Sequence, residues 1–308
     1  MSPPQNPDGH TEDANGPPFR QPHRSEPDGQ WSVLSKGALT KILVLAVIVA
    51  LSGWIARVDP TILFNTDARM QMWSFVSEGI PPDVSREYLF GRSLRDGLFW
   101  AVIETVAISV VGIVIAVGLA IPLALTSAAN VTHQGPLFAR SSAPTRTAGK
   151  TVYRLSHSLA SFLRSVPDLV WGFLFVTAVG LGPFAGALAI GVHNAGVLGK
   201  LYAEFLEDTD PMPAEAVYGT GATRLQTVVH AVLPQVTPTM LSYTLYRWEC
   251  AIRAATILGF VGAGGIGYYL TITISRLQYP KLVTAIIAVF VLVLGADYLS
   301  ARVRTSLL

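Results

Sequence analysis

One long apolar stretch of this sequence, residues 236–261, contains three charged side chains: Arg247, Glu249 and Arg253. A charge at the centre of a membrane-spanning helix costs roughly 2.5–3.5 kcal/mol on insertion scales, so three of them need a reason. The arginine guanidinium donates hydrogen bonds from a planar fork that matches phosphate-like oxyanions. These residue types predict either a path for anions through a membrane or a set of ion pairs that fix neighbouring helices.

The spacing separates the two interpretations in part. Glu249 and Arg253 are four residues apart and can pair along one helix face, as can Arg164 and Asp168, so we favour a structural role for both pairs. At about 100 degrees per residue, Arg247 points about 120 degrees away from Arg253 and needs another partner or a watery cavity. The candidates for a translocation path are Arg247, Glu249, Arg253, Glu104 and His193.

The composition is that of a protein that crosses a membrane several times. Hydrophobic residues make up 51% of the chain and charged residues 14%, against roughly 25% charged in soluble domains. The net charge of +2 and the lack of a basic, aromatic-interleaved stretch give no indication of nucleic-acid binding. The single cysteine, Cys250, excludes an intrachain disulfide framework.

We predict an all-α fold with six transmembrane helices and both termini in the cytoplasm. The loop 127–154 has four basic residues and no acidic one, which indicates the cytoplasmic side. The turn signal at 180–183 divides a long uncharged stretch in two, although one crossing by 155–203 would leave five spans. Segments 57–96 and 262–280 are expected outside. The predicted spans are about 36–56, 98–126, 155–180, 183–203, 236–261 and 281–301 of a membrane domain covering 36–308.

Residues 1–35 differ in composition from the rest of the chain. They hold seven prolines and few large apolar side chains, so they cannot bury enough surface to fold. We expect a disordered cytoplasmic tail.

The segment 204–234 lies between two predicted spans and is polar and turn-rich. Asp210 and Pro211 predict a helix start, and Gly219 and Gly221 predict a break in the chain direction. Pro234 is expected to stop the second helix. The apolar face of that second helix is predicted from Leu225, Val228, Val229, Val232 and Leu233. The pattern predicts a docking element for a soluble partner, with an ordinary surface hairpin as the alternative.

The same segment resembles the EAA loop of ABC-importer permeases. Glu215, Ala216 and Gly221 stand at its first, second and glycine places, and Leu233 and Pro234 at its end. Val217 and Ala231 replace the third Ala and the Ile of the pattern. Residues 193–207 and 241–267 are also similar to the phosphonate ABC-importer permease family, and the resemblance covers most of 98–303.

This resemblance implies a type I ABC-importer permease fold and the transport of phosphonate, phosphate or a related oxyanion by alternating access. It implies a second copy of this chain, an ATPase dimer that binds ATP and Mg²⁺ at the cytoplasmic face, and an extracytoplasmic substrate-binding protein. The chain itself would hold no cofactor and would be a multi-pass protein of the bacterial inner membrane. The implied ATPase-coupling residues are Glu215, Ala216, Gly219, Gly221, Leu233 and Pro234.

The run 262–267 satisfies G-x-G-x-x-G, but we reject a dinucleotide site because it follows a membrane span and no acidic residue occurs before Asp297. We interpret it as a gate or plain connecting loop. Those glycines are Gly262, Gly264, Gly265 and Gly267. The sequence has no metal-spaced His/Cys cluster and no nucleophile motif, so we expect no metal site and no enzyme activity.

Two other functions remain open from the sequence. A permease for another small solute, such as methionine, would show the same hairpin. A secondary transporter that works without ATP would also use paired intramembrane charges.

Overall fold

The computed structural model describes residues 36–92, 96–135, 138 and 142–307, and the predicted tail at 1–35 lies outside them. The described residues form helices and no strand, which confirms the all-α prediction. The chain divides into two units, Met1–Asn65 and Thr66–Leu308.

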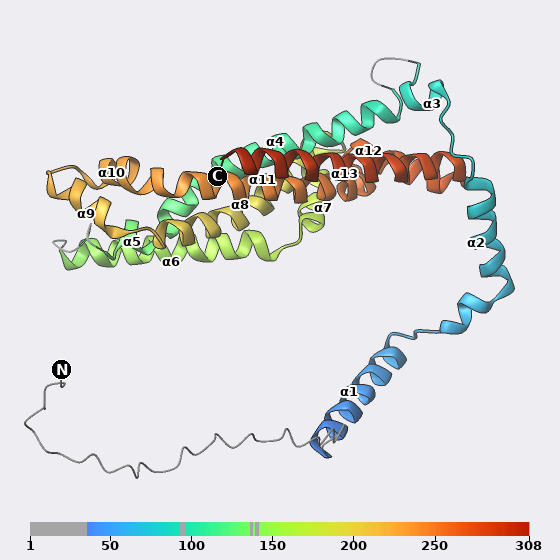
Figure 1. The fold of residues 1–308 in the computed structure, drawn as a ribbon, viewed down its shortest axis with the longest axis horizontal. Helices are drawn as coiled ribbons and strands as arrows, with labels where there is room; N and C mark the ends of the chain where they lie inside the picture. Colours follow the sequence, from blue (N-terminus) through green and yellow to red (C-terminus); the bar gives the residue numbers. More distant parts are fainter. Residues whose placement is uncertain (1–35, 93–95, 136–137, 139–141, 308) are drawn as a thin grey trace, which may run out of the picture. The chain divides into compact units, whose positions relative to one another are not determined.

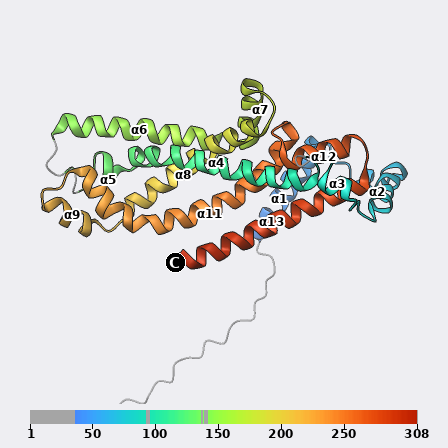
Figure 2. The ribbon, with the colours of Figure 1, turned by 90° about the horizontal axis from the view of Figure 1, so that it is seen from above.

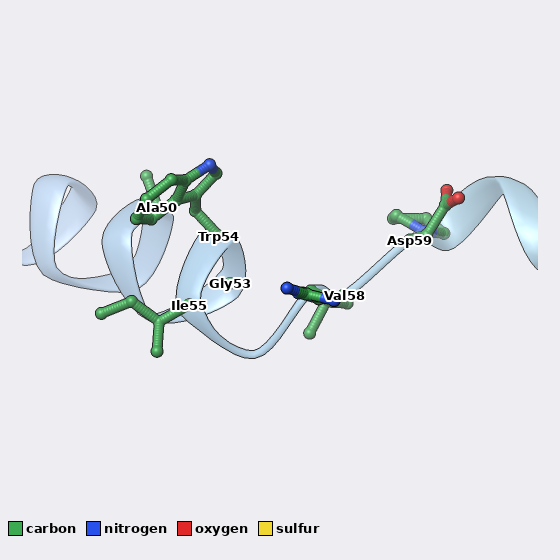
Figure 3. Close-up of a pocket in the computed structure, with 8 residues that line it drawn as sticks. Ala50, Gly53, Trp54, Ile55, Val58 and Asp59 are labelled. Atoms are coloured by element: carbon green, nitrogen blue, oxygen red, sulfur yellow. The ribbon is translucent and has the colours of Figure 1, made fainter.

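The first unit contains α1 (Lys36–Ile55) and the short helix η1 (Pro60–Phe64). Asp59 caps η1 by accepting a hydrogen bond from the Thr61 backbone N–H at 2.9 Å. Figure 3 shows the shallow depression where α1 ends, between Trp54 and Asp59. Trp54 is 78% exposed there, and the lining is mostly apolar apart from Arg57 and Asp59.

The second unit is a helical bundle. Its long helices are α4 (Leu98–Ser127), α6 (Ala143–Ser165), α8 (Pro183–Glu207), α11 (Leu233–Leu258) and α13 (Tyr279–Leu307) (Figures 1 and 2). Its shorter elements are α2 (Thr66–Gly79), α3 (Arg86–Phe90), α5 (Ala129–Thr132), α7 (Asp168–Val179), α9 (Pro211–Gly219), α10 (Arg224–Thr227), η3 (Val228–Val232), η4 (Gly259–Val261) and α12 (Gly265–Ser275).

Helix α8 occupies the centre of this bundle because small residues let its neighbours approach. A Cβ on Gly112 of α4 would stand 2.7 Å from Cγ2 of Ile190 in α8. A Cβ on Gly196 of α8 would stand 2.6 Å from the backbone N of Arg164 in α6. Both distances are too short for real carbon contacts, so α8 touches α4 and α6 at positions where only glycine fits.

By length and composition, three described helices can cross a membrane: α4, α8 and Tyr279–Thr305 of α13. Two bent pairs bring the number to five if each pair is one span. They are α6 with α7, bent by 89°, and 224–261 with α12, bent by 43°. Thr40–Ile55 of α1, at the predicted first span, is a shorter apolar helix. The count of six therefore stays a prediction.

Three segments expected to be loops are partly helical. Segment 57–96 contains α2 and α3, segment 262–280 contains α12, and segment 127–154 contains α5 and the first half of α6. Composition did not separate the polar helices α2 and α3 from loop, and the glycines before α12 favoured a loop there. The third predicted span, 155–180, is likewise not one straight helix, since the chain bends after Ser165 where Pro167 interrupts the pattern.

Candidate functional site

The hairpin 204–234 begins as its sequence predicts. Asp210 caps α9, and its Oδ1 accepts a hydrogen bond from the Met212 N–H at 3.0 Å, with Pro211 as the first helical residue. Helix α9 ends at Gly219, and the chain reverses at Gly221, whose φ is +92°. This left-handed conformation favours glycine, so the predicted break in direction is confirmed.

The second arm of the hairpin starts with a capping box that the sequence analysis did not use. The Gln226 N–H donates to the Thr223 hydroxyl, and the Thr223 N–H donates to the Gln226 side chain at 2.9 Å. The T-x-x-Q spacing of Thr223 and Gln226 could have predicted this capping box from the sequence. Helix α10 then widens into the π-helical turn η3, in which the Leu233 N–H donates to the Val228 carbonyl, five residues back.

The prediction that Pro234 stops this helix is wrong. Pro234 is the second residue of α11, and the chain stays helical through η3 into that span. Proline is tolerated in a first turn because its missing N–H has no required partner there and its fixed φ suits the helix. The second arm of the hairpin and the span after it are therefore joined without a loop.

The wide turn also changes which apolar residues are buried. Val228 and Val232 are buried as predicted, and Leu233 is half-buried, but Leu225 is 70% exposed and Val229 is 44% exposed. The predicted single face used a regular helix period, and the π turn breaks that period. Leu225 and Val229, with the exposed Met212 of α9, leave the hairpin an apolar surface without a partner inside the described part of the chain.

The hairpin lies at the same end of the bundle as α5 and the start of α6 (left in Figures 1 and 2). Val232 and Ala214 pack there against Leu206 of α8 and the turn at Ala128. The Ala129 N–H also donates to Glu207 of α8 at 2.6 Å. A movement of the hairpin would therefore act directly on α4, α8 and α11.

The coupling residues implied by the resemblance have different surroundings. Glu215, Ala216, Gly219 and Gly221 are exposed on the hairpin, and Leu233 is half-buried at the start of α11, beside the exposed Pro234. The first four are thus accessible to a partner, whereas Leu233 and Pro234 connect the hairpin to the membrane helix.

Among the membrane charges, Arg247 contacts a residue that the sequence analysis missed. Its Nε and Nη2 donate to the side-chain oxygen of Asn194 at 2.9 and 2.6 Å. Asn194 lies on α8 and is 2% exposed. The preceding residue, His193, contacts the Val166 carbonyl through Nδ1 at 2.9 Å. Adjacent residues of α8 thus contact α11 and the bend between α6 and α7.

The predicted pair Glu249–Arg253 is wrong. Arg304 of α13 lies 2.9 Å from Glu249, and Arg253 lies 3.9 Å from Asp297 of α13. Helix α13 packs along α11 and offers an opposite charge to each residue, which spacing within one helix could not reveal. Both ion pairs link helices, as the structural interpretation requires.

The predicted pair Arg164–Asp168 is also wrong. The two residues lie on α6 and α7, with the bend of 89° between them, so the four-residue helical spacing does not apply. Asp168 instead accepts a hydrogen bond from the adjacent Leu169 N–H at 2.9 Å, at the start of α7. No ion pair joins it to Arg164 within the described ranges.

Glu104 and the glycine run form one junction. An Oε of Glu104 accepts from the Gly265 N–H at 3.0 Å, at the first turn of α12. Gly264 and Gly265 have φ of +81° and +67°, which lets the chain turn there. Gly267 packs against Gly259, where a Cβ would collide with backbone. Glu104 thus stabilises a helix start, and its role in transport stays a prediction.

The comparisons with known proteins match this architecture. The family described as "Binding-protein-dependent transport system inner membrane component" matches residues 135–307, which is more than half of the chain. The chain belongs to this family. Its members are transport components, so the chain is a permease subunit and a multi-pass inner-membrane protein, and the expectation that it is not an enzyme is confirmed.

Individual relatives agree with the family. The permease is 35% identical over 276 residues to the phosphite transport system permease protein PtxC of Stutzerimonas stutzeri, which is 90% of each chain. It is 31% identical to the phosphate-import permease protein PhnE of Mycolicibacterium smegmatis, over 83% of this chain and 44% of that one. A chain of the MetNI methionine ABC transporter shares the fold, with a TM-score of 0.57 and 22% identity over 68% of this chain and 96% of that one. The predicted type I importer fold is thus confirmed.

For metal binding, the described residues contain no group of three or more His, Cys, Asp or Glu side chains that could hold an ion.

Proposed function

We propose that this permease is the membrane subunit of an ATP-driven importer for phosphite, phosphonate, phosphate or a related oxyanion. The observation that supports this most directly is the likeness to the phosphite permease PtxC along 90% of both chains. The arginines within the bundle agree with it, because a guanidinium suits a tetrahedral oxyanion.

The hairpin 204–234 seats the partner ATPase, which binds ATP and Mg²⁺. Its exposed residues include Glu215, Ala216 and Gly221, and its second arm continues into α11. A push on the hairpin is therefore carried into a membrane helix without a flexible joint, which is what alternating access requires.

The same assembly has two copies of the permease. Each chain has one hairpin, and two copies related by a two-fold axis present matching hairpins to two ATPase subunits. A substrate-binding protein delivers the anion on the opposite face. Cross-linking of the purified complex tests the stoichiometry, and a complex with one copy of this chain beside a different permease would contradict the homodimer.

Six spans and cytoplasmic termini complete the proposal. The hairpin shares one end of the bundle with the exposed basic residues Arg146, Lys150 and Arg154 of α6, which supports a cytoplasmic position by the positive-inside rule. A Leu225→Cys variant in a Cys250→Ser background should react with an impermeant thiol reagent only from the cytoplasmic side. Labelling from outside would reverse the topology.

Transport by proteoliposomes containing the permease, its ATPase and its binding protein tests the function. Uptake of radiolabelled phosphite, phosphate and methylphosphonate is compared with uptake of methionine, with ATP and then with a proton gradient alone. ATP-dependent uptake of an oxyanion is the expected result. Uptake of methionine alone would favour another small solute, and uptake driven only by protons would favour a secondary transporter.

A further inference from the structure

The charged residues of α11 differ in what neutralises them. Glu249 and Arg253 each face an opposite charge on α13, at 2.9 and 3.9 Å. Arg247 forms no ion pair with any residue that the structure describes. Its hydrogen bonds go to the neutral amide of Asn194. Among the described residues, Arg247 therefore places a positive charge without an ion-pair partner about halfway along α8 and α11.

Asn194 orients this charge. Its amide Nδ2 donates to the Ile190 carbonyl at 2.8 Å, one turn back on α8, and this contact turns Oδ1 toward α11. The Nε and Nη2 of Arg247 both donate to that oxygen, so one edge of the guanidinium is held by the protein. Its Nη1 makes no hydrogen bond with any described residue and is not among the buried atoms that lack a partner. Donors of Arg247 thus remain available to a ligand.

The energetics favour an anion as that ligand. An isolated charge inside a bilayer is costly, and a neutral amide satisfies hydrogen bonds without removing the charge. An oxyanion would neutralise the guanidinium and accept its remaining N–H groups.

We propose that Arg247, held by Asn194 as its positioning residue, is the oxyanion-binding group of the translocation path, and that Glu249 and Arg253 are structural. This inference rests on the proposed function, and it reduces five candidate residues to one ligand-binding side chain. Asn194 was not a candidate from the sequence.

The decisive variant is Asn194→Asp. It preserves the size of the side chain and the acceptor for Arg247, but it supplies the carboxylate that the wild-type site lacks. The complex should assemble with a melting temperature close to that of the wild type, because pairing the buried charge offsets the loss of the hydrogen bond that the Asn194 amide donates to the Ile190 carbonyl. Uptake should fall about tenfold or more, because the oxyanion loses a hydrogen bond to a charged group and such a loss weakens binding by about this factor. Arg247→Gln should lose uptake to a similar extent, and Arg247→Lys should retain part of it.

Arg302→Gln is the matched control, because Arg302 lies exposed near the end of α13 and its side chain donates to the Tyr298 hydroxyl at 3.1 Å. ATP hydrolysis stimulated by the binding protein is measured beside uptake for every variant. Wild-type uptake by assembled Asn194→Asp or Arg247→Gln complexes would overturn the inference. Absence of oxyanion uptake in the wild type would instead contradict the proposed function.

Discussion

Arg304 Nη2 lies 2.9 Å from Glu249 Oε1, which joins the last turns of α13 to a carboxylate inside α11. The Glu249 side chain is only 8% exposed, and Arg304 is its ion-pair partner among the residues that the structure describes. One residue near the end of the chain thus stabilises the helix that carries Arg247.

Replacing Arg304 with Gln should destabilise the permease, because removing one partner leaves a buried charge uncompensated. Loss of one partner of a buried pair costs about 3–5 kcal/mol, and the 31% exposure of Arg304 places the expected loss at or below the lower end of that range. Thermal unfolding of the purified complex measures it. Arg302→Gln, two residues away and exposed, should change stability by less than about 0.5 kcal/mol. Equal melting temperatures for the two variants would show that the ion pair contributes nothing.

A bulky residue at Gly221 should uncouple ATP hydrolysis from uptake. The φ of +92° is strained for any residue with a Cβ, so Gly221→Val should change the angle between the two arms of the hairpin. We expect near-normal ATP hydrolysis with uptake reduced about tenfold or more, if the hairpin acts as a rigid lever.

Gly219→Val is the control for this prediction. Neither glycine has a neighbour within 4 Å of a built Cβ, and only Gly221 has a positive φ. Coupled transport in both variants would argue against the rigid hairpin, and equal loss in both would assign the effect to side-chain size instead of backbone geometry.

Leu225→Ala should weaken binding of the ATPase without affecting folding. Leu225 is 70% exposed on the hairpin, so its truncation should remove little packing inside the permease. Truncating a side chain that is important in a protein interface commonly lowers the binding free energy by more than about 1 kcal/mol. Co-purification or biolayer interferometry with the ATPase measures the change. Leu181→Ala serves as the control, since Leu181 is 78% exposed in the turn before α8, at the opposite end of that helix from the hairpin. Unchanged ATPase affinity for Leu225→Ala would remove this side chain from the interface.

The permease should lose stability in mild acid through His133. Burial, then the nearby Lys150 and Arg146, hold the pKa of His133 below its ordinary value of 6.5, with a smaller opposing effect from Glu207. The unfolded chain therefore binds a proton that the folded chain resists, and stability falls as pH drops below about 6.5. Melting temperatures between pH 8 and pH 5 measure the slope.

His133→Gln should show a smaller loss of stability over the same pH range, because glutamine does not titrate. The tilted ring contact between His133 and Tyr153, with centroids 5.1 Å apart, makes some constant loss of stability expected at every pH. Parallel pH curves for wild type and variant would assign the acid sensitivity to other groups.

Features that depend only on residues close together in the chain could be predicted without the folded structure. The cap at Asp210, the turn at Gly221 and the apolar helices follow from local backbone preferences and from the cost of exposing apolar surface in water. The likeness of 204–234 to a coupling loop also needed no tertiary structure, because it consists of residue types at fixed spacings.

The pairing of the charges in α11 could not be predicted in this way, because it depends on how the helices pack. Glu249 and Arg253 have the spacing of a helical ion pair, yet each finds its partner on α13, and Arg247 finds a neutral one on α8. Electrostatic energy depends on distance in space, and two helices far apart in sequence can bring charges closer than one helix does. The position of Pro234 in the first turn of α11 could not be predicted from local patterns either. A proline after an apolar helical pattern predicts a helix end, and only the folded structure shows that the helix continues through η3.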